Sequence, residues 1–303
     1  MKRCYYLLFL FLSLCLFSTL SYALTFQLPK NGANIVGNVF TVFVEPGDSF
    51  QEIAYRYDVG YNALRWANPQ IKNPNKLRPW TPIIIPNAFV LPPKPQQGIV
   101  INLPELRLYY FPSDEPVVMI YPVGVGRPDW ETPIIETKVV IKDENPVWTV
   151  PKSIKEYMAS KGVELPASVA PGPENPLGKY ALRLSAWGYL IHGTNQPKSI
   201  GRRSSSGCIR MLPQDIAELF AHVPVGTPVR IINQPYKTGW YKNEFYLEAY
   251  PPFDDQTQIA RNHEHEVERA ILTHYHKSKQ KLDWQQIQNI ASSHVGYPKF
   301  ISR

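Results

Sequence analysis

The stretch "IHGTNQPKSIGRRSSSGCIRM", residues 191–211, contains one histidine, one cysteine, three consecutive serines and three arginines. Residues 189–191 have the character of a β-strand, which would present His192 at its end, where Gly193 permits a tight bend. The segment that follows is long enough to return the thiol of Cys208 to the imidazole. A thiolate is the reactive nucleophile, and a histidine paired with it as imidazolium favours its formation. The stretch therefore predicts a cysteine nucleophile with a histidine base.

The residues around the cysteine offer further groups for acyl-transfer chemistry. The backbone amides of Gly207 and Cys208, if they turn inward, can hold a developing oxyanion. Arg210 follows on the same face of an extended segment, where its guanidinium can receive a substrate carboxylate in a bidentate contact. The candidate substrate-binding residues are Arg210, Thr194, Ser205 and Ser206.

The N-terminal segment "MKRCYYLLFLFLSLCLFSTLSYA", residues 1–23, has a basic start, an apolar run and a small residue at its end. This pattern predicts a secretory signal peptide cleaved after Ala23. A retained membrane anchor is the alternative, but the run is shorter than the ~20 residues that a spanning helix needs. Lipid attachment at Cys15 is disfavoured because Leu14 is not small. We expect no membrane span after cleavage.

The cysteine count supports a reactive thiol. Of the three cysteines, Cys4 and Cys15 would leave with the signal peptide, and only Cys208 would remain. The exported chain could then form no internal disulfide. An unpaired thiol in an oxidising compartment is a liability unless it has a chemical role.

The bulk composition indicates a folded, β-rich and mildly basic protein. Its 44% hydrophobic residues are ample for a core, and 30 prolines favour turns and short strands over long helices. The net charge of +7 is not gathered into a long Lys/Arg run, which argues against a nucleic-acid partner. An anionic cell envelope is a more suitable partner.

Residues 39–87 read as strand, helix, helix and strand. The turn Pro46-Gly47-Asp48 precedes a helix that Asp48 or Ser49 can cap, a second short helix covers residues 61–67, and residues 83–85 form a closing strand. The unit resembles a LysM module in its Pro-Gly-Asp-Ser turn, its Asn-Pro and its final Ile-Ile-Pro. The resemblance implies binding of the N-acetylglucosamine chains of peptidoglycan. The alternative is a module that keeps the shape without the sugar site.

After a proline-rich linker, short strands separated by turns predict a mainly β, sandwich-like or barrel-like catalytic domain over residues 97–233. Residues 143–178 interrupt it with a short helix at 153–160, and they form either a lid beside the site or a surface elaboration. Residues 234–303 have helical spacing and predict a helical C-terminal extension with two helices. The second is expected from about Asp283, whose side chain can cap it, to about Ser293. The expected strands are residues 99–102, 106–111, 117–123, 134–141, 181–184, 189–191 and 228–232.

The order His-Gly-Thr followed by Ser-Ser-Gly-Cys-Ile-Arg-Met resembles the L,D-transpeptidases, whose catalytic domain is the YkuD type. The resemblance extends over about residues 97–233, and with the LysM unit it is similar to the exported ErfK/YbiS group. It implies that Cys208 is the nucleophile, that His192 is the base and that the carbonyl of Gly193 orients the imidazole, with no cofactor and no metal. One position departs from the family: Ser206 stands where many members have a histidine.

The activity implied by this resemblance is acyl transfer on peptidoglycan in the periplasm. Cys208 would attack the carbonyl of the diamino acid in a tetrapeptide stem, release D-alanine and pass the acyl group to an amine. The acceptor would be another stem, giving a 3→3 cross-link, or a lysine of an envelope lipoprotein. Two alternatives remain: hydrolysis by an L,D-carboxypeptidase, and a noncatalytic protein that binds the wall through LysM alone.

Several side chains permit a second interpretation. Four histidines cluster in the C-terminal extension and are expected to lie on a solvated helix; the alternative is a transition-metal site. They are His263, His265, His274 and His276. Three tryptophans are expected to pack in the core, and the alternative is that they line a substrate groove. They are Trp130, Trp148 and Trp187.

Overall fold

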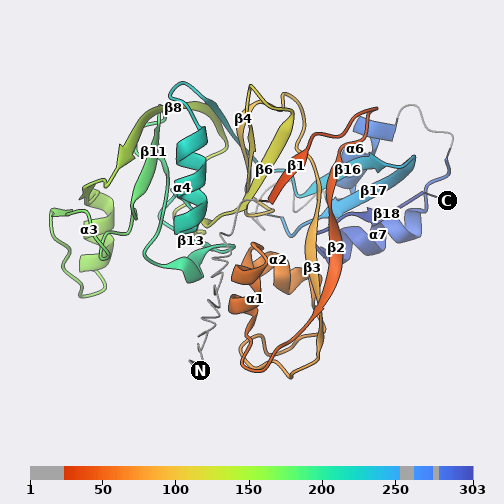
Figure 1. Cartoon of the computed structure of the whole chain (residues 1–303), viewed down its shortest axis with the longest axis horizontal. Coiled ribbons are helices and arrows are strands. Elements are labelled where there is room, and N and C mark those ends of the chain that lie inside the picture. Colours follow the sequence, from red (N-terminus) through yellow and green to blue (C-terminus); the bar gives the residue numbers. More distant parts are fainter. Residues whose placement is uncertain (1–23, 253–262, 276–279, 303) are drawn as a thin grey trace, which may run out of the picture.

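The computed structural model describes residues 24–252, 263–275 and 280–302, whose arrangement Figure 1 shows. The segment expected to be a signal peptide, residues 1–23, lies outside these ranges, and so does His276. Within the described ranges no helix is long and apolar enough to cross a membrane.

One sheet of nine strands forms the centre of the molecule, in the order β1-β6-β5-β4-β15-β8-β11-β12-β14. Neighbouring strands are antiparallel except in the pairs β4–β15 and β12–β14. All seven strands expected between residues 97 and 233 are present within a few residues of their expected ends. The strands are β1 (Leu24–Gln27), β4 (Gly98–Asn102), β5 (Arg107–Phe111), β6 (Val117–Pro122), β8 (Ile135–Glu144), β11 (Tyr180–Leu184), β12 (Leu190–His192), β14 (Ile209–Arg210) and β15 (Pro228–Ile232).

Two features of this domain were not anticipated from the sequence. The edge strand β1 comes from residues before the LysM unit and pairs with β6 from Leu24↔Ile120 to Gln27↔Val117. Helix α4 (Pro213–His222) begins directly after the cysteine segment and buries Ile216 and Leu219 in the main core. Smaller pairs are formed by β7 (Val125–Gly126) with β13 (Arg203–Ser205), and by β9 (Trp148–Thr149) with β10 (Ser168–Val169).

The LysM unit has the order expected from its sequence. Strands β2 (Ile35–Phe43) and β3 (Pro82–Val90) pair along their whole length, and α1 (Phe50–Arg56) and α2 (Tyr61–Ala67) lie between them in the chain. Of the two expected caps, Ser49 is the one used: its Oγ accepts the Glu52 amide, and the Glu52 side chain accepts the Ser49 amide. In Figure 1 this unit projects from the middle of the molecule.

The C-terminal extension contains the two expected helices and also a sheet that the sequence analysis did not anticipate. Helix α6 (His263–Tyr275) and helix α7 (Trp284–Ser293), which is capped by Asp283 as expected, pack on β16 (Tyr236–Tyr241), β17 (Glu244–Ala249) and β18 (Lys299–Phe300). Lys242 and Asn243 join β16 to β17 with φ values of +47° and +64°. A two-residue turn with both φ positive matches the right-handed twist of a hairpin.

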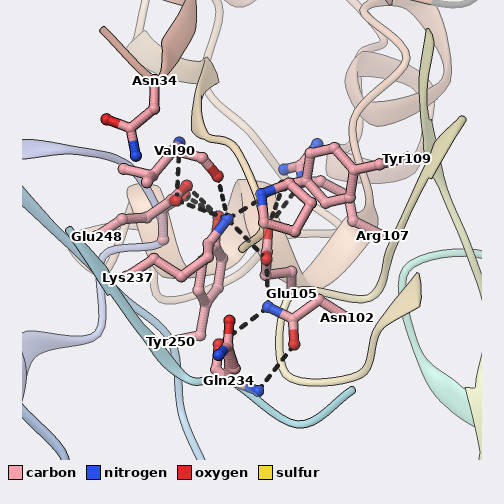
Figure 2. A network of polar contacts seen from close by, with 12 residues as sticks. Asn34, Val90, Asn102, Glu105, Arg107, Tyr109, Gln234, Lys237, Glu248 and Tyr250 are labelled. Carbon is pink, nitrogen blue, oxygen red and sulfur yellow. Dashed lines mark hydrogen bonds and ion pairs between the residues drawn. The ribbon is translucent and has the colours of Figure 1, made fainter. Parts of the chain in front are cut away.

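A buried polar network holds the three units together, and Figure 2 shows it at close range. Lys237 Nζ lies 2.8 Å from Glu105 Oε1 and 3.0 Å from Glu248 Oε2, and it also donates to Val90 O at the end of the LysM strand. Glu248 in turn accepts the Val90 amide at 3.0 Å. The two carboxylates are fully buried. Because a buried charge needs its partner, the network fixes how the LysM unit, the catalytic sheet and the C-terminal unit pack.

Candidate active site

His192 ends strand β12 and is 4% exposed. Its Nδ1 lies 2.6 Å from the carbonyl oxygen of Gly193, while the Gly193 amide donates to Tyr180 O at 3.0 Å. The contact at Nδ1 requires the proton there, which leaves Nε2 as the acceptor. The carbonyl expected to orient the imidazole is therefore in contact with it.

The environment of His192 keeps its imidazole uncharged. Burial, and then the positive charge of Arg210, lower its pKa to about 4. Contacts of the ring with the backbone of Gly193 and Leu177 oppose this shift only in part. At neutral pH the ring can accept a proton, as a general base must.

Cys208 lies in a tight turn that delivers it to the start of β14. Gly207, just before it, has a φ of +102°, and its carbonyl accepts the hydroxyl of Thr132 at 2.8 Å. The Ser205 hydroxyl accepts the Gly207 amide at 3.2 Å and donates to Cys208 O at 2.5 Å. Ser205, which was expected to contact substrate, is buried, and its hydroxyl makes both of these contacts within the turn.

The Cys208 thiol is also uncharged at rest. Burial raises its pKa, and the Leu190 amide and the charge of Arg210 counteract this only in part. The thiol lies 3.6 Å from Gly188 O and is half-buried. The sequence suggested a thiolate paired with an imidazolium. Both pKa directions instead favour a neutral thiol and a neutral imidazole, and burial is the first cause of each.

Arg210 lies beside His192, since the two residues are in register across the parallel pair of β12 and β14. Ser206, Cys208 and Arg210 are half-buried, whereas their neighbours Ser205, Gly207 and Ile209 are buried. Ser206 therefore remains a candidate for substrate contact. Arg210 Nε is buried and has no hydrogen-bond partner among the described residues.

A second arginine near the site was missed from the sequence. The positive charge of Arg127 helps to lower the pKa of Arg210, after the larger effect of burial. The guanidinium of Arg127 lies 4.6 Å from the ring centroid of Tyr157 and 5.1 Å from that of Trp130. Its only sequence signal was a basic residue after the β-rich segment, which does not reveal proximity to Arg210.

Two other candidates, Thr194 and the Gly207 amide, make hydrogen bonds within their own loops. Thr194 is 4% exposed, and its Oγ1 accepts the Gln196 amide at 2.9 Å, so it shapes the loop after His192. Of the two amides considered for an oxyanion site, that of Gly207 already donates to Ser205. The Cys208 amide makes no hydrogen bond within the described part of the chain.

The segment between β8 and β11 contains helix α3 (Lys152–Ala159), which buries no residue of its own. Tyr157 on this helix stacks edge-on against Trp130, with ring centroids 5.8 Å apart. Trp130 thus contacts the segment, whereas Trp187 is 97% exposed in the turn before β12. A lid remains one interpretation of the segment and a surface elaboration the other.

His222 and His274, which lie outside the site, make local contacts. His274 Nδ1 lies 3.0 Å from Thr238 Oγ1, and His222 Nδ1 lies 2.9 Å from Glu218 O. In the described residues no three potential ligands gather into a metal site.

Comparison with known proteins agrees with this geometry. The model of the L,D-transpeptidase catalytic domain (YkuD) matches residues 96–231, and that of the LysM domain matches residues 43–86. A protein of Escherichia coli (strain K12) named "Probable L,D-transpeptidase YcfS" is 43% identical over 245 residues, covering 78% of this chain and 76% of its own. The chain belongs to the L,D-transpeptidase family.

Two further relatives from the same strain extend this transpeptidase match. "Probable L,D-transpeptidase ErfK/SrfK" is 39% identical over 85% of this chain and 84% of its own. "Probable L,D-transpeptidase YbiS" is 38% identical over 78% of each. The resemblance drawn from the His-Gly-Thr and Ser-Gly-Cys-Ile-Arg motifs, and from the LysM pattern, is therefore confirmed.

Proposed function

We propose that this transpeptidase is exported to the periplasm and transfers peptidoglycan acyl groups through a cysteine thioester. Cys208 is the nucleophile, His192 the base, and the diamino-acid carbonyl of a tetrapeptide stem the electrophile. The observation that carries the proposal is the parallel pair of β12 and β14, which brings His192 and Arg210 into register and places Cys208 at the entry to the same pair. The LysM unit would hold the glycan of the same polymer.

The neutral resting pair defines the order of proton transfers. As Sγ attacks the carbonyl carbon, the thiol proton moves to His192 Nε2, and the contact with Gly193 O stabilises the imidazolium that forms. The Cys208 amide donates to the oxyanion. The C–N bond then breaks, and the imidazolium protonates the leaving D-alanine amine. The products of this half-reaction are a thioester and a neutral histidine.

The second half-reaction reverses these transfers with a different amine. An acceptor amine attacks the thioester carbonyl and loses a proton to His192, and the thiolate leaves and is reprotonated. Arg210, whose Nε has no hydrogen-bond partner among the described residues, would bind a carboxylate of the stem. A stem amine as acceptor gives a 3→3 cross-link, and a lysine of an envelope lipoprotein gives wall anchoring.

The experiment is intact-mass spectrometry of the purified protein and of Cys208→Ala, each incubated with a disaccharide tetrapeptide and then with an amine acceptor. We expect an adduct equal to the stem minus D-alanine in the wild type alone, followed by a dimeric muropeptide or an acceptor conjugate. An adduct that yields only tripeptide would indicate the carboxypeptidase. No adduct with any stem would leave the noncatalytic wall-binding alternative.

A further inference from the structure

The LysM unit is in direct contact with the loop that joins His192 to Cys208. The Asn62 amide, in the first turn of α2, donates to Gly201 O at 3.2 Å. Gly201 has a φ of +72°, and a Cβ there would lie 2.2 Å from Tyr61 N and 2.5 Å from Gly60 Cα. The two backbones therefore touch at a point where a side chain does not fit.

Arg202 extends this contact to a side chain. Its guanidinium carbon lies 3.3 Å from the centroid of the Tyr61 ring, and its Nε donates to Lys198 O at 3.0 Å. Tyr61 is 6% exposed and belongs to the LysM core. A cation over a buried aromatic face is attractive, and the ring cannot move without disturbing that core. Arg202 is thus held against the LysM unit.

Backbone contacts lead from this point to the catalytic residues. The Gly201 amide donates to Val123 O at 3.1 Å. The next residue, Gly124, exchanges two hydrogen bonds of 2.8 Å with Arg210. Arg210 is in register with His192. A shift of the loop at Gly201 would therefore strain the strand that carries Arg210 and begins directly after Cys208.

We propose that Tyr61 and Arg202 are positioning residues: through them the LysM unit holds the loop of residues 193–207 in the conformation in which Cys208 reacts. This inference rests on the proposed cysteine mechanism and adds to the LysM unit a role separate from glycan binding. A substrate without any glycan should then still depend on the LysM contact.

The test measures acylation of the purified protein by a soluble tetrapeptide stem that carries no sugar. We expect Arg202→Gln and Tyr61→Leu each to lower the maximal acylation rate about tenfold with little change in the half-saturating concentration. Tyr61→Phe keeps the ring and should retain the rate. The matched control is Phe43→Ala, which removes an aromatic side chain that is 60% exposed on the same unit.

A double variant separates a shared contact from two independent defects. If Arg202 and Tyr61 act through one contact, Arg202→Gln combined with Tyr61→Leu should be no slower than the slower single variant. A double variant whose acylation rate falls by the product of the two single-variant factors would overturn the proposal. Tyr61→Leu also removes core volume, which by itself can prevent folding. In that case the acylation rate of Arg202→Gln, a change at a half-buried position, decides the test.

Alkylation of Cys208 by iodoacetamide gives a readout that needs no substrate. We expect Arg202→Gln to react severalfold faster at pH 8, because a displaced loop exposes the Cys208 thiol and relieves the burial that raises its pKa. Equal alkylation rates in Arg202→Gln and wild type would overturn the proposal. A wild type that no stem acylates would refute the proposed function, and the alkylation rates would still decide the positioning role.

Discussion

Replacement of Asp58 by asparagine should stabilise the protein, and increasingly so as the pH rises. Asp58 follows α1 at the face of the LysM unit that meets α4, and it is 4% exposed. Neither of its carboxylate oxygens has a hydrogen-bond partner among the described residues. Asp215, in the first turn of α4, is likewise buried and without such a partner. Two acidic groups from different units thus meet where water is excluded.

The charges around Asp58 determine the sign of the effect. Burial raises its pKa to about 7 from 3.8, Arg107 opposes this shift, and Glu218 adds to it. The pKa of Asp215 is also raised, first by burial and then by Asp58. A raised pKa in the folded state means that ionisation opposes folding. The contribution of Asp58 to the free energy of unfolding should therefore fall as the pH rises from about 4 to about 7, and then level off.

The size of the effect follows from the two pKa values. The difference between about 7 in the folded chain and 3.8 for an ordinary aspartate corresponds to an upper limit of roughly 4 kcal/mol at full ionisation. An asparagine side chain has nearly the same volume as that of Asp58 and carries no charge to desolvate. We expect Asp58→Asn to gain up to about 4 kcal/mol at pH 8 and almost nothing at pH 4.

Urea denaturation of wild type and variant at pH 4.5, 6, 7 and 8 measures this difference. The matched control is Asp114→Asn at an exposed turn position, which should change the free energy of unfolding by less than about 0.5 kcal/mol. The reasoning is wrong if Asp58→Asn is less stable than wild type and the deficit grows with pH. That result would mean that Asp58 is ionised in the folded chain and paired with Arg107.

Three further results are expected. Lys237→Met should lower the free energy of unfolding, measured in urea, by about 3–5 kcal/mol, because Glu105 and Glu248 then remain buried without their shared cation. A loss below about 1 kcal/mol would contradict this. The rate of Cys208 alkylation should keep rising beyond pH 9, since burial raises the thiol pKa above its usual 9.0; a plateau near pH 7 would indicate a resting ion pair. Ser205→Ala should slow acylation about tenfold or more, because the turn loses the hydroxyl that bonds the Gly207 amide and the Cys208 carbonyl. An unchanged single-turnover acylation rate would show that the turn does not need these two hydrogen bonds.

Local chemistry explains most of what was predicted correctly. The N-terminal ends of α1 and α7 depend on Ser49 and Asp283, whose side chains each accept the amide three residues ahead. The strands of the catalytic sheet depend on β-branched and aromatic residues between proline-rich turns. The hairpin of β16 and β17 was missed because Lys242 and Asn243 are a less common pair than Asn-Gly for a turn with both φ positive.

The sequence by itself determined the family and the two motifs, and it singled out His192, Cys208 and Arg210 as candidate site residues by their order along the chain. Only the tertiary structure decided how these groups are charged and what supports them. The pKa directions of His192 and Cys208 depend on burial, and burial depends on strands that are distant in sequence. The contact of Gly60 with Gly201 and the charge interaction of Asp58 with Asp215 arise because two separate units pack together. Solvent exclusion and packing between distant segments are properties of the whole fold, so no local pattern encodes them.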